Sequence, residues 1–286
     1  MRLVRFGRRG AERPGMLDRE DRIRDLSAYV PDWSGAALGP DALAEIAGLD
    51  PAALPPAPEG SPLASPIGRV EKVVGVGPNF QESAQLAGFR INPEPTVFMK
   101  APTAVCGPND PIELPRLSTR TDWGVELGVV IGSTAKYVTV EQAMEHVAGY
   151  TLCNDVTERN LQLQRGGQWF KGKSHDTFAP LGPWLVTKDE MPDWGETTLW
   201  LEVNGVRQQE DKAGRMIFKV PYLVSYISRF TRLEPGDVIM TGTPGGVGLS
   251  YDPPRFLGDG DRVRLGGDGL GVQEHVCIAN WSDNDR

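Results

Sequence analysis

Short apolar runs separated by glycine-containing turns dominate the second half of the sequence. Residues 199–208, LWLEVNGVRQ, carry an Asn-Gly pair between two alternating runs, which is typical of a β-hairpin. Residues 233–248 (LEPGDVIMTGTPGGVG) and 257–267 (LGDGDRVRLGG) repeat Gly-Asp turns between short apolar runs. This alternation of short apolar runs and turns predicts a mainly β protein with some α-helix, built as a mixed β-roll. It argues against a doubly wound βαβ sheet.

The N-terminal quarter differs from the rest of the chain. Short strand-like segments open it, and residues 50–68 (DPAALPPAPEGSPLASPIG) are dense in Pro and Ala, which is typical of an extended linker. We therefore expect a small N-terminal β-rich domain with its linker over residues 1–66 and a catalytic domain over residues 67–286. Helical spacing predicts helices over three segments, namely 41–49, 140–150 and 222–230.

Charge and composition exclude some classes of protein. The net charge is −8 at pH 7, so the chain has no basic footprint for nucleic acid. No apolar stretch is long enough for a membrane span, and the N-terminus lacks the apolar core of a secretory signal. With three scattered cysteines, a reducing cytoplasm is the expected location. An acidic protein repels small anions, so a site for an anionic substrate needs its own cations or a metal.

The segment TDWGVELGVVIG, residues 121–132, raises the question of a metal site. As a strand it places Asp122, Gly124 and Glu126 on one face. Carboxylates at every second position converge from one side, which suits a hard divalent cation. The central position is glycine, which offers no ligand.

Further polar groups follow apolar segments. Asp155 ends the run YTLCN, and Arg159 and Gln162 lie one turn apart if a helix starts there. Asp155 can serve as a helix N-cap or as a metal ligand, and an arginine on a polar helix face is usually solvated. Lys171 and Lys173 flank a glycine that allows a ligand to approach the backbone closely.

The segment TGTPGG, residues 241–246, offers the hydroxyls of Thr241 and Thr243 and glycine N–H groups that can face an anion, although it can equally be a plain turn. No glycine-rich segment opens a convincing helix, so the sequence gives no dinucleotide fingerprint. No histidine lies near a nucleophile elbow either.

Six segments occur in a characteristic order along the chain: VGVGPNF, EPTVFMK, TDWGVELGVVIG, VAGYTLCNDVTER, GGQWFKGKSHDTFAPLGPWLVT and LEPGDVIMTGTPGGVG. Through them the sequence resembles the fumarylacetoacetate hydrolase family over roughly residues 68 to 280. It is most similar to the branch of 2,4-diketo-3-deoxy sugar-acid hydrolases and homoprotocatechuate-pathway isomerases. The resemblance implies a mixed β-roll domain, a homodimer, and a Mg²⁺ or Mn²⁺ site that binds a 2-keto acid or a 1,3-diketone as its enolate.

The resemblance also shows what this chain has lost. The family's metal ligands project onto Gly124, Glu126 and Asp155, so one carboxylate is absent. Glu126 and Asp155 then form a residual metal pair, and metal binding is expected to be weak or absent. Asp122 can approach a displaced metal from the same strand face, although support of a neighbouring ligand or a surface ion pair is the commoner role for such an aspartate. The His–Glu pair of the hydrolytic lid projects onto Ser83 and Leu86.

Other positions of the family's pocket are retained. The resemblance implies that Lys173 takes part in catalysis. It also implies that five residues contact the substrate: Lys100, Arg159, Gln162, Thr241 and Thr243. Two residues are candidates for a replacement acid or base: Glu82, one position before the lost histidine, and His175 of GKSHDTF. His175 can equally be a packing or surface histidine.

Three functions remain open at this stage. The first is a non-hydrolytic enzyme of enolate chemistry, which means an isomerase, tautomerase, cyclase or lyase acting on a small keto acid or diketone. The second is a metal-dependent C–C bond hydrolase of acylpyruvates or diketo acids, in which Glu82 or His175 activates the water. The third is a non-catalytic relative that only binds a small acid. Retention of the cationic positions favours a working pocket.

Overall fold

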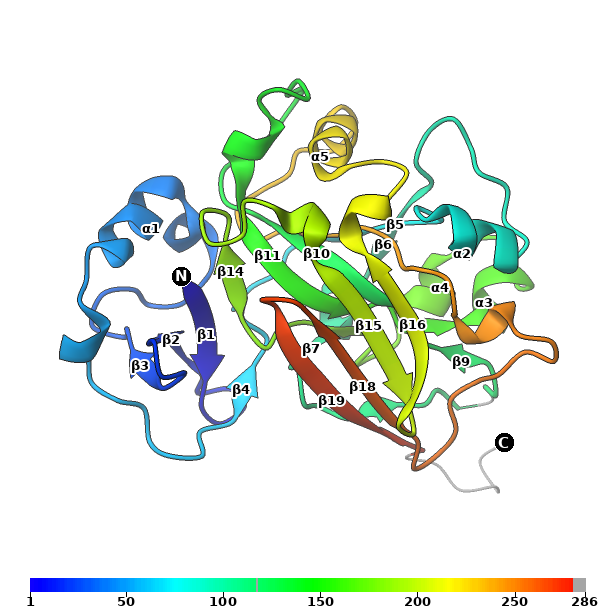
Figure 1. Cartoon of the computed structure of the whole chain (residues 1–286), viewed down its shortest axis with the longest axis horizontal. Coiled ribbons are helices and arrows are strands. Elements are labelled where there is room, and N and C mark those ends of the chain that lie inside the picture. Colours follow the sequence, from blue (N-terminus) through cyan, green and yellow to red (C-terminus); the bar gives the residue numbers. More distant parts are fainter. Residues whose placement is uncertain (117, 280–286) are drawn as a thin grey trace.

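The computed structural model describes residues 1–116 and 118–279. Two large β-sheets pack against each other and share one hydrophobic core (Figure 1). In the described residues the larger sheet has ten strands, with β4 (Leu63–Ala64) beside β1 and the others in the order β3 (Ile23–Asp25), β2 (Arg13–Leu17), β1 (Arg2–Phe6), β14 (Leu185–Thr187), β11 (Val147–Asn154), β10 (Val125–Ile131), β17 (Val238–Met240), β5 (Val73–Val76) and β6 (Val97–Lys100).

The second sheet has five strands over the same residues, and two short pairs lie beside the sheets. The second sheet runs in the order β16 (Val206–Lys212), β15 (Thr198–Val203), β18 (Arg262–Gly267), β19 (Gly271–Ile278) and β8 (Ile112–Glu113). The short pairs are β12 (Thr157–Glu158) with β9 (Thr121–Asp122), and β13 (Ala179–Pro180) with β7 (Val105–Cys106). The predicted mainly β fold with some helix is confirmed.

The N-terminal strands continue the larger sheet, because β1 pairs with β14 through Arg2↔Val186 and Leu3↔Leu185. Trp33 is fully buried beneath them, and its indole Nε1 donates to the carbonyl oxygens of Val4 at 3.0 Å and Gly15 at 3.1 Å. This indole therefore bridges β1 and β2 through two hydrogen bonds. The division of the chain at residues 66 and 67 stays a prediction.

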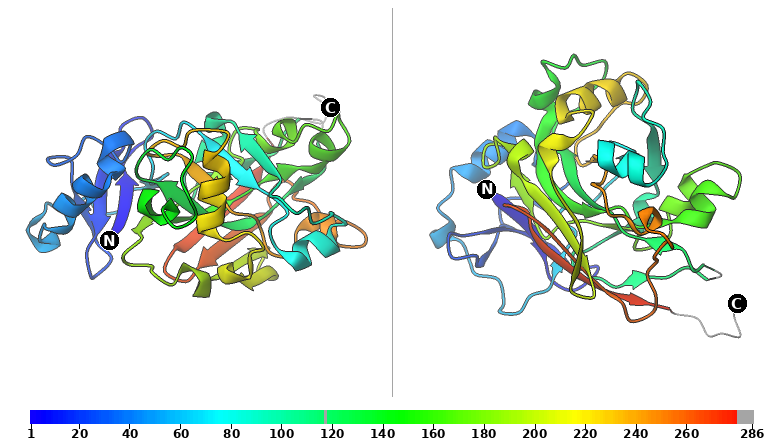
Figure 2. Two further views of the ribbon diagram at one scale, coloured as in Figure 1. Left: turned by 90° about the horizontal axis from the view of Figure 1, so that it is seen from above. Right: turned by 45° about the vertical axis from the view of Figure 1, so that its right-hand side comes forward.

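The helices occupy three places. Helix α1 (Pro40–Ala47) lies with the N-terminal strands, and α5 (Val220–Ser228) crosses one end of β10 and β11 (Figure 1). Helices α2 (Gln81–Leu86), α3 (Arg159–Leu163) and α4 (Phe170–Lys173) gather at the opposite side from α1, as the turned views of Figure 2 also show. The candidate site described below lies among these three helices.

Two of the three predicted helices are confirmed, as α1 and α5. The helix predicted over 140–150 is wrong: a 3₁₀ turn covers only Ala143–His146, and β11 begins at Val147. All eight residues of β11 are buried, so packing on both faces outweighs the helical spacing of the sequence. The Asn204–Gly205 hairpin is confirmed, and both residues have the positive φ that its tight turn requires.

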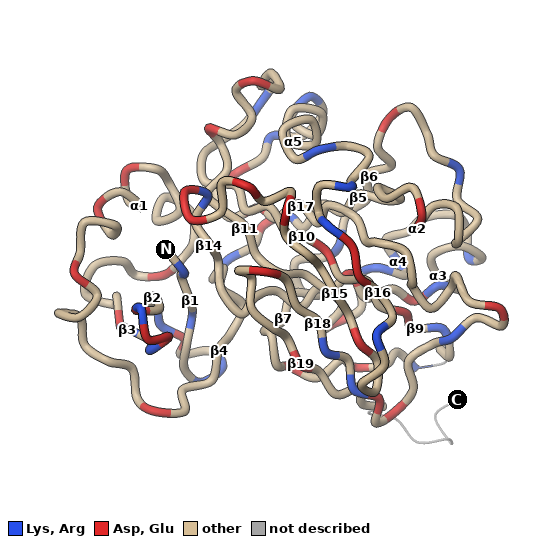
Figure 3. Tube along the Cα trace, viewed as in Figure 1, with Lys and Arg blue, Asp and Glu red and all other residues tan. Residues whose placement is uncertain are grey.

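Basic and acidic residues are interspersed along the whole described trace (Figure 3). No helix in the described residues is long and apolar enough to cross a membrane.

Candidate active site

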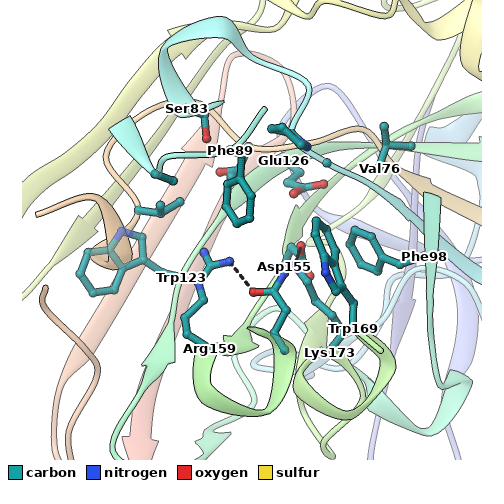
Figure 4. A pocket seen from close by; sticks show the side chains of 16 residues that line it. Val76, Ser83, Phe89, Phe98, Trp123, Glu126, Asp155, Arg159, Trp169 and Lys173 are labelled. Carbon is teal, nitrogen blue, oxygen red and sulfur yellow. Dashed lines mark hydrogen bonds and ion pairs between the residues drawn. The ribbon is translucent and has the colours of Figure 1, made fainter. Parts of the chain in front are cut away.

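A pocket opens between α2, α3, α4 and the ends of β5, β6 and β10 (Figure 4). Its chemistry comes from polar side chains that reach it from segments far apart in the sequence. These are Ser83, Glu126, Asp155, Arg159, Gln162, Lys173 and Thr243. Six of them were predicted to bind substrate or metal or to take part in catalysis, and the seventh, Ser83, stands at the position of the lost lid histidine.

Asp155 holds two buried ammonium groups at once. Lys100 Nζ lies 2.6 Å from Asp155 Oδ1, and Lys173 Nζ donates to Oδ2. Lys100 also donates to the Val156 carbonyl at 2.9 Å and is fully buried. Burial alone raises the pKa of Asp155, but the two lysines lower it to about 2. Asp155 is therefore an anion at neutral pH, and both of its oxygens are engaged.

Lys173 and Glu126 have shifted pKa values in this cluster. Burial, together with the cations of Lys100 and Arg159, lowers the pKa of Lys173 to about 8 against the opposing effect of Asp155. Burial raises the pKa of Glu126 well above its ordinary value, with the charge of Asp155 adding to the effect. Gly242 N–H donates to Glu126 Oε2 at 2.8 Å. Burial thus favours the uncharged form of each of these two groups.

Arg159 points into the pocket from the first turn of α3 (Figure 4). Its Nε donates to Asp122 Oδ2 at 2.7 Å, and its Nη1 donates to Gln162 Oε1 at 3.0 Å. Asp122 also accepts the N–H groups of Gly248 at 2.7 Å and Leu249 at 3.0 Å. Asp122 thus holds the Arg159 guanidinium next to the backbone of residues 248 and 249, which follow the TGTPGG segment.

The two threonines of TGTPGG differ in their surroundings. Thr243 lines the pocket, and its Oγ1 accepts from Gln209 Nε2 at 2.7 Å. Thr241 is fully buried away from the pocket lining, and its hydroxyl donates to the Leu127 carbonyl at 2.8 Å. Lys100 likewise reaches the site only through Asp155. The structure brings Thr243, Arg159 and Gln162 to the cavity and leaves Thr241 and Lys100 behind it.

Neither predicted replacement base lines the pocket. Glu82 is exposed on α2, near Gly245, while its neighbour Ser83 faces the cavity. His175 packs against Phe178 with ring centroids 5.2 Å apart, and its buried Nε2 has no hydrogen-bond partner among the described residues. Burial lowers the pKa of His175, which favours the neutral ring. Lys173 and Glu126, in contrast, both line the pocket.

Aromatic side chains form one wall of the pocket, and the sequence analysis missed them. Lys173 Nζ lies 4.5 Å from the ring centroid of Phe98 and 5.9 Å from that of Trp169. The two rings are 5.4 Å apart. A signal was available, because Phe98 and Lys100 alternate along one strand and so share a face. The sequence analysis also did not predict a role for Gln209, which lies in the segment RQQEDKA and donates to Thr243.

A divalent cation does not fit the carboxylates of this site as they stand. Both oxygens of Asp155 accept from ammonium groups, and those of Asp122 accept from Arg159 and backbone N–H groups. Gly124 leaves the third position without a ligand, and within residues 1–116 and 118–279 no cluster of three or more His, Cys, Asp and Glu could hold a metal. Glu126 alone is a weak oxygen donor set for Mg²⁺ or Mn²⁺.

The family is shown by direct comparison. Residues 72–277 match the fumarylacetoacetate (FAA) hydrolase C-terminal model, and the chain belongs to this family. A protein of Burkholderia ambifaria (strain MC40-6) named "Putative hydrolase" is 52% identical over 274 residues, which are 96% of this chain and 97% of that protein.

Two solved structures that resemble this chain are named for different reactions, one a hydrolase and the other an isomerase. The fumarylacetoacetate hydrolase of Exiguobacterium antarcticum matches with a TM-score of 0.84 at 32% identity, over 98% of this chain and 100% of that one. The 5-carboxymethyl-2-hydroxymuconate delta-isomerase of Mycobacterium smegmatis matches with a TM-score of 0.78 at 32% identity, over 99% of this chain and 100% of that one. The predicted resemblance, including its isomerase branch, is confirmed, and the protein is a family enzyme.

Replacing Asp122 by Asn should destabilise the protein and weaken substrate binding together. The variant keeps the size of the side chain but leaves the buried Arg159 without its counter-ion, which costs about 3 kcal/mol or more in the free energy of unfolding. We expect urea denaturation to show this loss and oxalate binding to weaken about tenfold. Glu196→Gln, which breaks only the exposed pair with Lys212, is the control and should leave the stability almost unchanged. Equal effects of the two variants would contradict the role given to Asp122.

Restoring a carboxylate at position 124 should restore metal affinity. A Cβ there meets Thr243 Oγ1 at 3.3 Å, so the threonine must shift slightly to admit a longer side chain. Chelator-treated protein is titrated with Mg²⁺ and Mn²⁺ in a calorimeter, with and without oxalate. We expect Gly124→Glu to bind at least tenfold more tightly than the natural protein, or by about 1.4 kcal/mol. Gly124→Gln matches the size without the charge and should not gain. Tight binding by the natural protein would overturn the donor-set argument.

Proposed function

We propose that this protein is an enzyme that acts on a small 2-keto acid or 1,3-diketone and catalyses a non-hydrolytic step of enolate chemistry. The step is an isomerisation or tautomerisation, with cyclisation and C–C lyase chemistry as variants of it. The observation that carries the proposal is that Lys173 and Glu126 line the same pocket as Arg159, where burial lowers the pKa of the lysine and raises that of the glutamic acid. The homodimer implied by the family stays a prediction.

The substrate's carboxylate is the group that Arg159 recognises. Its Nε and Nη1 are held by Asp122 and Gln162, so the guanidinium is fixed in place before a ligand binds. The Thr243 hydroxyl lies on the same pocket surface and can donate to the same anion. Because a planar guanidinium matches a carboxylate in shape, this contact orients the substrate as well as attracting it.

Proton transfer is assigned to Lys173 and Glu126. The neutral amine of Lys173 removes a proton from the carbon next to the keto group. The protonated carboxyl of Glu126 donates a hydrogen bond to the keto oxygen as negative charge develops there. A buried neutral carboxylic acid is an effective donor to an enolate, because it pays no charge desolvation in the ground state. Returning the proton to another carbon completes an isomerisation.

Hydrolysis is the second candidate, and the names of the Burkholderia and Exiguobacterium relatives favour it. A hydrolase needs a base within hydrogen-bond reach of the attacking water. The lid positions of that base are Ser83 and Leu86 here, and Glu82 and His175 do not line the pocket. The isomerase named for Mycobacterium smegmatis supports the non-hydrolytic assignment.

Exchange of carbon-bound protons tests the proposal directly. The protein is incubated with pyruvate or 2-oxobutyrate in D₂O, and deuterium at the carbon next to the keto group is followed by NMR. We expect enzyme-dependent exchange that Lys173→Met reduces by roughly 10²–10⁴-fold while oxalate binding is retained. Acetylpyruvate in ¹⁸O water should not be cleaved. Cleavage with solvent oxygen incorporated would establish the hydrolase, and binding without exchange would indicate a non-catalytic relative.

The pH dependence of kcat/KM for proton exchange should follow the protonation states of Lys173 and Glu126. Lys173 must be neutral to accept a proton, so kcat/KM for exchange is expected to rise with pH through about 8. It should fall again at higher pH, when the pair has lost its remaining proton. In chelator-treated Gly124→Glu the added negative charge favours the ammonium form, so the rise moves to higher pH. Gly124→Gln should leave the profile unchanged. A profile without a rise near pH 8 would contradict the assignment of Lys173.

A further inference from the structure

Three aromatic rings lie in a row along one side of the pocket (Figure 4). The ring centroids of Phe98 and Trp169 are 5.4 Å apart, and those of Trp169 and Phe89 are 6.0 Å apart. Phe98 is buried, whereas Trp169 and Phe89 are half-buried. The row therefore runs from the interior of the pocket toward its mouth.

Apolar side chains continue beyond the outer end of this row. Leu86 on α2 is 52% exposed and precedes Ala87, which lines the pocket. Phe170 on α4 is 50% exposed and follows Trp169. Because both side chains adjoin the lining, the apolar surface of the pocket extends onto α2 and α4 instead of ending at a polar rim.

The cations of the pocket leave no counter-ion for a second anionic group on a substrate. In the part of the chain that the structure describes, Arg159 and Lys173 are the cationic side chains of the lining. The proposed function assigns Arg159 to the substrate's carboxylate, and Lys173 donates to Asp155. Arg90 follows Phe89 in the sequence, but it is exposed and does not line the pocket. A second carboxylate would therefore face the electron-rich faces of aromatic rings.

The enclosed part of the pocket is small, with a volume of about 40 Å³. One buried water molecule needs roughly 10–15 Å³ of such space, so the enclosed part has room for about three. A carboxylate and the adjoining keto group are enough to fill it. The remainder of a substrate must then lie in the open mouth, against the rings of Trp169 and Phe89.

We propose that the row of Phe98, Trp169 and Phe89 is a subsite for an apolar tail of the substrate. This inference rests on the proposed function and names its class of substrate. The substrate is a keto acid with a single carboxylate, which contacts Arg159, and with an apolar tail that lies against the rings. A dicarboxylate of the same length is a poor ligand, because its second carboxylate loses hydration at the mouth without gaining a counter-ion.

A matched pair of keto acids tests this class of substrate. The carbon chains of 2-oxohexanoate and 2-oxoadipate have the same length, and they end in a methyl group and a carboxylate, respectively. Their binding to the natural protein is measured by calorimetry, together with proton exchange in D₂O. We expect 2-oxohexanoate to bind at least about tenfold more tightly than 2-oxoadipate. We likewise expect 4-phenyl-2-oxobutyrate to bind at least about tenfold more tightly than 2-oxobutyrate.

Phe89→Ala removes the ring at the mouth of the pocket. It should weaken binding of 4-phenyl-2-oxobutyrate at least about fivefold more than binding of 2-oxobutyrate, because only the longer acid reaches this ring. Phe230→Ala is the matched control, since Phe230 is 58% exposed, follows α5 and lies outside the pocket lining. It should leave both affinities unchanged.

Leu86→Lys adds a cation at the mouth, on an exposed position that accommodates a long polar side chain. We expect it to shift the ratio of the two affinities toward 2-oxoadipate, relative to 2-oxohexanoate, by at least about fivefold. Leu86→Gln adds a polar group without a charge and should not produce this shift.

Equal binding of 2-oxohexanoate and 2-oxoadipate by the natural protein would overturn the inference, as would equal effects of Phe89→Ala and Phe230→Ala. If either result came with proton exchange that depends on Lys173, the proposed function would still stand. Selective binding of the acids with apolar tails, without exchange of any probe, would support the subsite and remove the proposed reaction.

Discussion

The carboxylate of Asp155 accepts hydrogen bonds from two buried lysine ammonium groups, and the geometry of the pocket depends on this sharing. Lys100 comes from the end of β6, Lys173 from the end of α4, and Asp155 from the residue after β11. One side chain thus joins three segments that are distant in the sequence. If Asp155 were lost, two cations would remain buried beside each other, which is far more costly than breaking an exposed ion pair.

The charges of this cluster explain why a glycine at position 124 matters. In a site with one more carboxylate, the cations would be outnumbered and a divalent metal could supply the missing positive charge. Here Asp122 and Asp155 are matched by Arg159 and Lys100 without a metal. Under the proposed function, Lys173 and Glu126 are then the pocket groups left to transfer a proton to and from the substrate.

Local patterns in the sequence predicted the features that depend on local geometry. The Asn204–Gly205 turn, helix α5 and the placement of Arg159 and Gln162 one turn apart on α3 all follow from spacing. The family resemblance identified Lys173 and Thr243. What the sequence could not predict was the direction of side chains set by distant contacts. Thr241 turns toward Leu127, and His175 packs on Phe178, although both stand in segments that reach the site. The strand at Val147 was missed because burial on both of its faces comes from other parts of the chain.

The proposed function requires that Lys173 lose its proton at a much lower pH than an ordinary lysine. The most direct measurement is an NMR titration of protein labelled with ¹³C at the lysine ε-carbons, with the Lys173 signal assigned by its absence in Lys173→Arg. We expect this signal to titrate with a pKa of about 8 in chelator-treated protein. A titration at about 10.4, the ordinary value for lysine, would contradict the role assigned to Lys173.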